Sequence, residues 1–406
     1  MSPRPSSSSP AAAPQLPEDL ILCSILPLLP VRSLARFAAV CKAWRDLILR
    51  DAAFAALQAR SPSPASSALA RFHNGRFEIL GAAAAAKSVA PDPSLSFLAV
   101  GRSGNHYEQL DLCAGAGGLL CMTAVHVESR RRVLFICNPA TENVHRILYD
   151  CPLGVPGLAY DPAAAERGYD VVVAAKEGWE ACRFCRYSSR AAGSGWRTTR
   201  GAATLRLAPY ESLQPKPACA GGRVHWFTSA GNIVWHDVAA VRSGVLPPPP
   251  PPPCQSSGNM DLAAWRGRLR LACATAAGLG VWELASYGGN GAAARWEAVH
   301  WRSWSAIPGV IAPERCFLWS VVPAGMVGGG EDALGLALRC AHVAPPERRA
   351  RGEAYVWVRA LVRYDRCTGA TVVAAKLAGK EIHDGLGTVV GYHSSLAPLP
   401  RLNFDA

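Results

Sequence analysis

Short strand-like runs separated by turn residues are the feature that most constrains the fold of this chain. From about residue 70 onward helical periodicity nearly vanishes, and runs rich in β-branched and aromatic residues are bounded by Gly, Pro, Asn and Asp. The runs are GLLCMTAV (Gly118–Val125), RRVLFICNP (Arg131–Pro139), YDVVVAAK (Tyr169–Lys176), GRVHWFT (Gly222–Thr228), NIVWHDV (Asn232–Val238), GRLRLAC (Gly267–Cys273), LGVWEL (Leu279–Leu284), ALGLALRC (Ala333–Cys340) and YVWVRALVRYD (Tyr355–Asp365). This pattern predicts a large all-β region.

The runs recur as a unit: a strand led by Gly, a turn, and a second strand that ends in an Asp or Asn turn. The units begin near residues 118, 157, 222, 267 and 334, a spacing on the scale of propeller blades with loop insertions. A sheet of this size cannot bury both of its faces alone, so it must stack on its neighbours. We expect residues 71–406 to form a β-propeller of five to seven blades.

The first part of the chain has a different pattern. Residues 1–15, MSPRPSSSSPAAAPQ, are low in complexity and predict a disordered tail. Apolar residues then recur at helical spacing, with Pro30 as an interruption, which predicts three short helices between residues 17 and 50. The segment SPSPASS (Ser61–Ser67) predicts a linker, which we place at residues 56–70.

The three helices carry more large apolar side chains than they can bury among themselves. Domains below about 40 residues usually need a metal, a disulfide or a partner to be stable, and this segment has no paired Cys and no metal ligands. An exposed apolar patch marks an interaction surface. Partner binding therefore explains the segment better than a cap packed on the large domain.

The run LPEDLILCSILPLLPVRSLARFAAVCKAWRDLI (Leu16–Ile48) resembles an F-box, with its LPxDL opening, central LPxxSL and closing VCKxWRxLI. The resemblance implies an F-box over residues 16–55 that binds the Skp-type adaptor and, through it, the cullin of SCF ubiquitin ligases. Pro27 departs from the family pattern, where a polar residue is usual near the end of the first helix. The adaptor-binding positions that the resemblance implies are Leu16, Pro17, Leu20, Ile25, Leu29, Pro30, Leu34, Val40, Cys41 and Trp44.

The β-rich region resembles, in patches between residues 115 and 396, the F-box-associated, kelch-like domains that follow F-boxes in plant-type families. The matching pieces are GLLC (Gly118–Cys121), CNPATENVHRIL (Cys137–Leu148), GLAYDP (Gly157–Pro162) with YDVVV, GRVHW, VWHDV, VWEL and YHSSL (Tyr392–Leu396). The resemblance implies a domain that binds a protein substrate.

Composition and motifs narrow the function further. The formal net charge is +12, but the basic residues are scattered, so nucleic acid is a less suitable partner than protein. The longest strongly apolar stretch, Leu20–Val31, is too short to span a membrane and contains two prolines. Fourteen Cys without regular spacing favour a reducing, intracellular compartment, in the cytoplasm or the nucleus.

No motif argues for catalysis or for a cofactor. Cys182 and Cys185 form CRFC, but no second Cys or His pair follows at the spacing of a zinc site. The glycines near residue 117 lack the Lys and the helix of a phosphate loop. We expect no cofactor and no metal.

Two features could contact a ligand. His300, Trp301 and Trp304 in VHWRSW could lie on a substrate-binding loop, because Trp is enriched at interfaces. The prolines Pro247–Pro253 predict a polyproline rod, either a partner site or a stiff connector between blades.

The resulting hypothesis is a non-catalytic substrate-recognition subunit of an SCF-type ligase. Two alternatives stay open: a kelch-type propeller enzyme, which needs convergent titratable or metal-binding groups in a central pocket, and a basic adaptor that binds nucleic acid.

Overall fold

The structure is a computed structural model that describes residues 16–60, 67–80, 94–98, 107–149, 151–161, 168–178, 180–191, 195–198, 205–249, 259–265, 267–288, 293–310, 313–316, 318–327, 332–352, 354–376, 388–397 and 399. The tail expected at residues 1–15 lies outside these ranges, as do residues 250–253 of the proline run and the Ser/Pro signal at 61–66.

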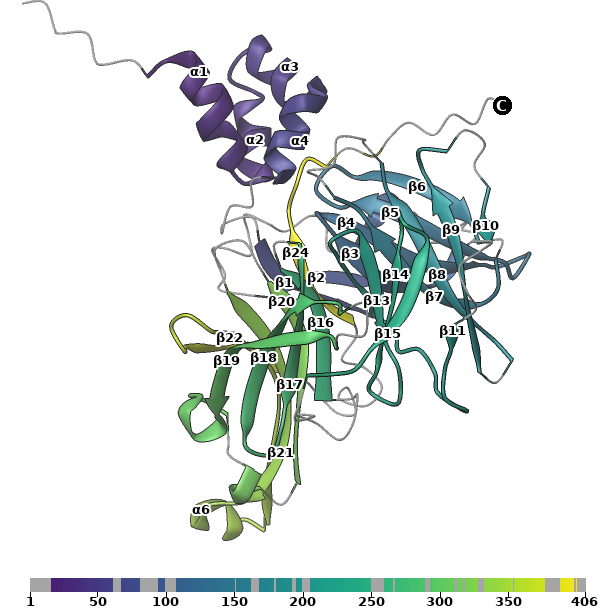
Figure 1. The fold of residues 1–406 in the computed structure, drawn as a ribbon. Coiled ribbons are helices and arrows are strands. Elements are labelled where there is room, and N and C mark those ends of the chain that lie inside the picture. Colours follow the sequence, from purple (N-terminus) through teal and green to yellow (C-terminus); the bar gives the residue numbers. More distant parts are fainter. Residues whose placement is uncertain are drawn as a thin grey trace, which may run out of the picture.

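A helical region precedes an all-β domain (Figure 1). The first predicted helix begins as α and continues as π and 3-10 turns, and Pro27 lies in the 3-10 turn, near whose start a missing backbone N–H is tolerated. The helical elements of this region are α1 (Glu18–Leu20), η1 (Ile21–Ile25), η2 (Leu26–Leu28), α2 (Val31–Phe37), α3 (Lys42–Arg50) and α4 (Ala52–Arg60).

Helix α4 occupies part of the segment that we expected to be a linker. Its N-terminus is capped by Asp51, whose Oδ1 accepts hydrogen bonds from the backbone N–H of Ala53 at 2.7 Å and of Phe54 at 3.0 Å. The alanine-rich run that follows has high helix propensity. Residues 56–60 therefore belong to a fourth helix, and residues 67–70 belong to the first strand.

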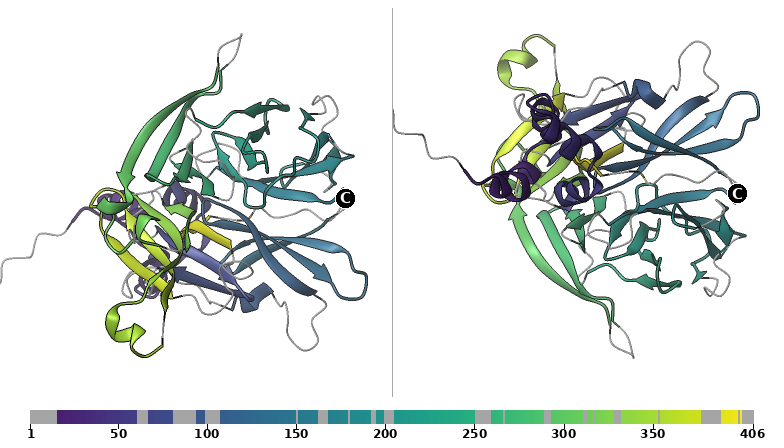
Figure 2. Two further views of the ribbon diagram at one scale, coloured as in Figure 1. Left: turned by 90° about the horizontal axis from the view of Figure 1, so that it is seen from below. Right: turned by 90° about the horizontal axis from the view of Figure 1, so that it is seen from above.

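The β domain is a six-bladed propeller, within the predicted range of five to seven blades. Figure 2 shows its sheets arranged around a centre. The strands of the first two blades after the helical region are β1 (Ser67–His73), β2 (Arg76–Leu80), β3 (Tyr107–Ala116), β4 (Leu119–His126), β5 (Arg132–Asn138) and β6 (Asn143–Leu148). The next two comprise β7 (Gly154–Ala159), β8 (Asp170–Glu177), β9 (Ala181–Ser188), β10 (Arg197–Thr198), β11 (Leu205–Arg206), β12 (Ala218–Ala220), β13 (Arg223–Phe227), β14 (Ile233–Asp237) and β15 (Arg242–Leu246).

The last strands are β16 (Met260–Trp265), β17 (Arg268–Ala274), β18 (Gly278–Ser286), β19 (Arg295–Ser303), β20 (Leu318–Val327), β21 (Ala333–Val343), β22 (Tyr355–Asp365), β23 (Thr371–Lys376) and β24 (Thr388–His393). Short helical turns lie in the loops: η4 (Ser96–Leu98), η6 (Trp304–Ala306), η7 (Pro313–Arg315) and α6 (Pro346–Arg349).

Both ends of the β domain contribute to one blade. Strand β24 pairs antiparallel with β1, from Ser67 opposite His393 to Phe72 opposite Thr388, and β1 pairs with β2. The inner strands β24, β3, β7, β12, β16 and β20 contact one another in this order, and β20 contacts β24. The ring is thus closed by the last described strand of the chain.

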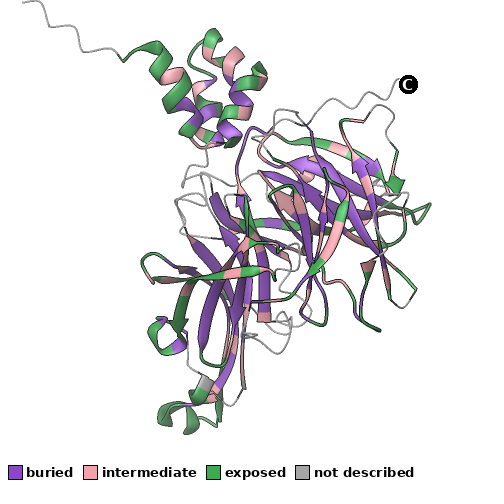
Figure 3. Cartoon of the chain, in the orientation of Figure 1, coloured by how far each residue is buried: buried purple, intermediate pink, exposed green. Residues whose placement is uncertain are grey.

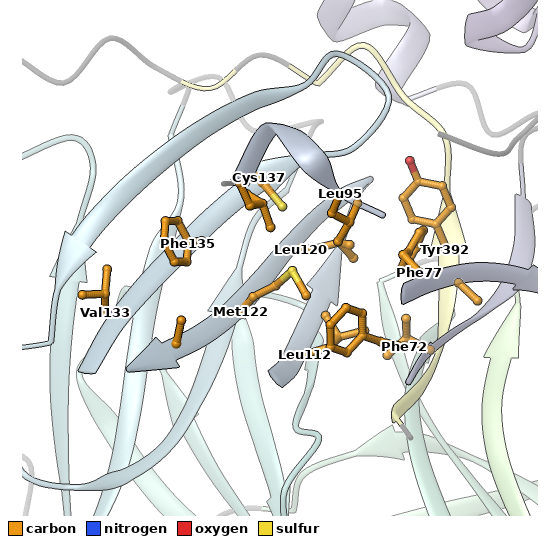
Figure 4. Close-up of a cluster of buried hydrophobic side chains, with 14 of the residues drawn as sticks. Phe72, Phe77, Leu95, Leu112, Leu120, Met122, Val133, Phe135, Cys137 and Tyr392 are labelled. Carbon is orange, nitrogen blue, oxygen red and sulfur yellow. The ribbon is translucent and has the colours of Figure 1, made fainter. Parts of the chain in front are cut away.

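Hydrophobic side chains fill the spaces between neighbouring blades. Between the closing blade and the next one, Phe72, Phe77 and Tyr392 pack against Leu120 and Met122 (Figure 4). Phe77 and Tyr392 meet edge to face with their ring centroids 5.2 Å apart. The two sheets thereby bury the faces that meet between them, as the strand pattern requires.

The C-terminal segment joins the helices to the propeller. Leu396 packs in the helical core with Leu26, Leu34 and Phe54. The side chain of Asn138, at the end of β5, is fully buried and donates from Nδ2 to the carbonyl oxygens of Ser395 and Ala397, both at 2.9 Å. The helices lie at one end of the propeller and α6 lies at the other (Figure 1).

Candidate functional site

The helices expose a set of apolar side chains that their own core does not cover. Their exposed fractions are 58% for Leu16, 43% for Leu20, 38% for Ile25 and 64% for Val40, and Leu28, outside the predicted set, is 54% exposed. Figure 3 shows α1 and the turn after it mainly in the colour of exposed residues. We call Leu16, Leu20, Ile25, Leu28 and Val40 the helical apolar surface.

The remaining predicted adaptor-binding positions divide into exposed, half-buried and buried ones. Pro17 and Cys41 are exposed, and the Sγ of Cys41 accepts a contact at 3.4 Å from the backbone N–H of Trp44 at the start of α3. Leu29, Pro30 and Trp44 are half-buried. Leu34 is completely buried in the helical core, so it shapes the surface without forming part of it.

Trp44 packs against the helical core. Its indole meets Phe37 edge to face at a centroid distance of 5.5 Å, and the pair packs beside the buried residues of the core. None of Leu16, Pro30 and Trp44 is sealed beneath the propeller. Leu28 was missing from the predicted set, although it continues the helical spacing of Ile21 and Ile25.

A central cavity of about 790 Å³ is lined by the inner strands of the propeller and by the end of α4. Four of the charged residues that line it form ion pairs: Asp170, Arg186, Arg190 and Lys216. Asp170 is almost fully buried and accepts from the Nε of Arg186 at 2.8 Å and from Arg190, while the Nζ of Lys216 lies 2.5 Å from Asp261. The charges at the cavity therefore act first as links between strands.

The side chain of His393 also lines this cavity. Its Nδ1 lies 3.2 Å from the Oγ of Ser67, and its Nε2 is buried without a hydrogen-bond partner. Burial lowers the pKa of His393 to about 4, so the ring is neutral at pH 7.

The CRFC motif lies on β9, where residues three apart point to opposite faces of the sheet. Cys182 packs in the cluster that contains Phe184 and Trp226, whereas Cys185 packs in the cluster that contains Tyr169 and Tyr187. The two thiols therefore cannot bind one metal ion together. Within the described ranges, no group of three or more His, Cys, Asp and Glu side chains is arranged to hold a metal.

The predicted ligand-binding loop is wrong for His300 and Trp301, because both residues lie in strand β19 and pair with β18. The Nε2 of His300 lies 3.1 Å from the hydroxyl of Tyr364, and burial, assisted by Arg366 and Arg302, lowers its pKa to about 4. Trp301 is 48% exposed on the outer strand of its blade. Its role in binding stays a prediction.

Trp304 also differs from the prediction, because its side chain is buried. It is 2% exposed, its Nε1 donates to the carbonyl oxygen of Thr275 at 2.7 Å, and its ring meets Trp319 edge to face. The residue belongs to the core between two blades, where a ligand could not contact it. Its large apolar ring favours this burial over exposure.

A comparison with known protein families identifies the helical region. Residues 13–55 match the model of the F-box-like family. No curated protein matches the chain. Among the described parts of the chain, no helix has the length and apolar character needed to cross a membrane.

Solved structures with a similar arrangement include enzymes. A prolyl endopeptidase is 14% identical with a TM-score of 0.37, and the alignment covers 86% of this chain and 53% of that one. This chain thus spans about half the length of that enzyme. The protein YjhT is 7% identical with a TM-score of 0.36, covering 69% and 86% of the two chains. An oligogalacturonate lyase in complex with manganese is 8% identical with a TM-score of 0.33, covering 78% and 81%.

At these scores the likenesses carry no argument about activity. The match of residues 13–55 and the closed ring of six sheets together define the organisation of the molecule. The chain consists of an F-box-like domain followed by a six-bladed β-propeller.

Proposed function

We propose that this protein is the substrate-recognition subunit of an SCF-type E3 ubiquitin ligase. Its F-box-like helices would bind a Skp-type adaptor and through it the cullin, while the propeller binds a target protein. The subunit itself performs no chemistry. It would act by holding an acceptor lysine close to the charged conjugating enzyme, which raises the effective concentration of the reacting groups.

The observation that carries the proposal is the helical apolar surface. Its five side chains lie on a domain that matches the F-box-like family, and each of them is more than a third exposed. Several exposed apolar residues on a small helical module are typical of protein interfaces. We infer an intracellular protein, because the proposed partners act inside the cell.

The proposal is tested with the double variant Leu16→Ala/Pro17→Ala of the full chain. We expect co-purification of the Skp-type adaptor to be lost while the melting temperature of the propeller stays the same. The matched control is Leu148→Ala/Leu153→Ala, which removes two exposed leucines of the propeller (60% and 68% exposed) and should leave adaptor binding intact. Normal adaptor binding by the first variant would show that the assignment of the surface is wrong.

A further inference from the structure

Two arginines face each other directly across neighbouring strands of the last blade. Arg339 on β21 and Arg359 on β22 are partners in the register of the sheet. Like charges directly opposite each other destabilise a sheet. Neither arginine forms an ion pair with a carboxylate of the described residues, and the Nε atoms of both are buried without a hydrogen-bond partner. Within the described residues, no carboxylate offsets the repulsion between the two guanidinium groups.

Aromatic and aliphatic residues continue the same face of the sheet. The next pairs in the register on this face are Ala341 opposite Trp357 and Val343 opposite Tyr355. Val343, Tyr355 and Trp357 are 59%, 44% and 50% exposed, and the guanidinium of Arg359 lies 5.3 Å from the centroid of the Trp357 ring. We call Arg339, Arg359, Trp357, Tyr355 and Val343 the arginine-aromatic face.

The other half of this face is covered by packing against the closing blade. Ala337 and Leu361 form the next pair in the opposite direction, and both are buried in the cluster that contains Leu69 and Val389 of the closing blade. The arginine-aromatic face begins where this packing ends. It lies toward α6, at the end of the propeller opposite the helical region (Figure 1).

The surroundings are basic. The loop that joins β21 to β22 contains Arg348 and Arg349 in α6 and the exposed Arg351, against two glutamates in its sequence, Glu347 and Glu353. A surface of one sign steers partners of the opposite sign and disfavours partners of the same sign. An acidic partner would also remove the unfavourable interaction between the two facing arginines.

We propose that the arginine-aromatic face binds an extended, acidic segment of a polypeptide. Asp or Glu carboxylates of the segment pair with Arg339 and Arg359, which present planar guanidinium donors suited to carboxylate oxygens. Alternate residues of an extended chain point to the same side, as do Tyr355, Trp357 and Arg359 along β22. The segment therefore carries an acidic residue and, two and four positions away, apolar residues that contact Trp357 and Tyr355.

This inference deepens the proposed function by naming the class of target segment, and its biological role rests on that function. The binding itself does not depend on the adaptor. Adaptor co-purification, measured on the same variants, therefore reports on the proposed function separately from the peptide measurements below.

The test is fluorescence anisotropy with the full chain and labelled eight-residue peptides at low salt. The first peptide has the sequence Ser-Val-Ser-Val-Ser-Glu-Ser-Glu. In the second peptide Gln replaces both Glu residues, and in the third phosphoserine replaces them. We expect the Glu peptide to bind and the Gln peptide to bind at least about tenfold more weakly, with binding that weakens as salt rises. Equal binding of the Glu and Gln peptides, or binding of the phosphoserine peptide alone, would overturn the carboxylate assignment.

Substitutions in the arginine-aromatic face test whether the peptide binds there. Arg339→Gln/Arg359→Gln should weaken binding of the Glu peptide at least about tenfold, and Trp357→Ala should weaken it several-fold, whereas Arg131→Gln/Arg242→Gln, at exposed arginines of other blades, should leave it unchanged. Because the Gln pair relieves repulsion, its melting temperature should equal or exceed that of the unchanged protein. A lower melting temperature would assign the arginines a structural role, and unchanged binding would move the site elsewhere; either result contradicts the proposal.

Discussion

The side-chain Oε1 of Gln58 accepts a hydrogen bond at 2.7 Å from the backbone N–H of Leu396, which lies 338 residues later in the chain. Gln58 is completely buried on α4, and Leu396 packs in the helical core. The next residue on α4, Ala59, packs in a propeller cluster with Ala397. The F-box-like domain is thus attached to the propeller by direct packing as well as by the chain that links them.

The first prediction concerns this attachment. Gln58→Ala leaves the buried N–H of Leu396 without a partner and should lower the free energy of unfolding by about 1–3 kcal/mol. Urea unfolding followed by tryptophan fluorescence measures the change. Leu57→Ala, at the neighbouring and 37% exposed position, is the control and should change stability much less. Equal midpoints for the two variants would contradict the importance of the hydrogen bond.

The second prediction separates the helical apolar surface from the helical core. Val40→Asp should abolish binding of the Skp-type adaptor without changing the melting temperature, because Val40 is 64% exposed. Leu34→Ala should instead destabilise the helical region by about 2–5 kcal/mol, because it leaves a cavity in the core. The two readouts are adaptor co-purification and thermal unfolding. A large loss of stability in Val40→Asp would argue against this division.

The third prediction is a loss of stability in mild acid. Burial lowers the pKa values of His225, His236, His300 and His393 to about 4, whereas an unfolded histidine titrates near 6.5. Between these values the unfolded chain binds more protons, so stability is complete above pH 6.5 and falls as the pH drops toward 4. Melting temperatures between pH 7.5 and 5 should show this fall.

Replacing one of these histidines measures its contribution to the acid effect. In His236→Gln the slope of stability against pH between 6.5 and 5 should be smaller, whatever the stability at pH 7.5. His236 stacks on Phe184 with the ring centroids 4.7 Å apart, so the variant is expected to be less stable overall. A slope equal to that of the unchanged protein would exclude His236 as a contributor.

The fourth prediction concerns the ring of inner strands. A Cβ atom at Gly391 of β24 would lie 2.0 Å from the carbonyl oxygen of Met326 on β20. Gly391→Ala should therefore push the closing strand away from its neighbour and lower the free energy of unfolding by about 1–3 kcal/mol. Gly195→Ala, where no atom lies within 4 Å of the added Cβ, is the control. If both variants melt at the same temperature, the contact between β24 and β20 is less tight than described.

Sequence patterns identified the central strands of the blades well. The runs at Gly222–Thr228 and Asn232–Val238 correspond to β13 and β14, and those at Gly267–Cys273 and Leu279–Leu284 to β17 and β18. These strands have neighbours on both sides and are covered on both faces, so they need continuous apolar residues. Their turns need Gly or Asn for backbone reasons.

The inner strands were not predicted from the same patterns. Strand β7, with the sequence GVPGLA, has two glycines because a Cβ at Gly154 or Gly157 would collide with neighbouring atoms. Close approach to neighbouring strands favours small residues, which removes the usual strand signal. The closing blade was missed because β1 and β24 are separated by most of the chain, and a local pattern does not reveal such a pairing.

The two proposed binding surfaces also differ in how visible they are in the sequence. The helical apolar surface could be inferred because its residues follow one another in a short segment. Arg339 and Arg359 are brought together by the register of β21 and β22, which depends on a loop whose length and shape the sequence pattern does not determine. The prediction that His300 and Trp304 contact a ligand was wrong in placement for a related reason. The sequence alone does not distinguish a buried indole or imidazole from an exposed one.

The pairing of β1 with β24 has a consequence for synthesis. A ribosome must translate the chain as far as His393 before β24 can enter the ring, and Leu396, which packs in the helical core, emerges later still. A product that stops before Thr388 would therefore have an open ring of sheets and an incompletely supported amino-terminal module. Binding through the helical apolar surface would thus depend on translation at least as far as Leu396.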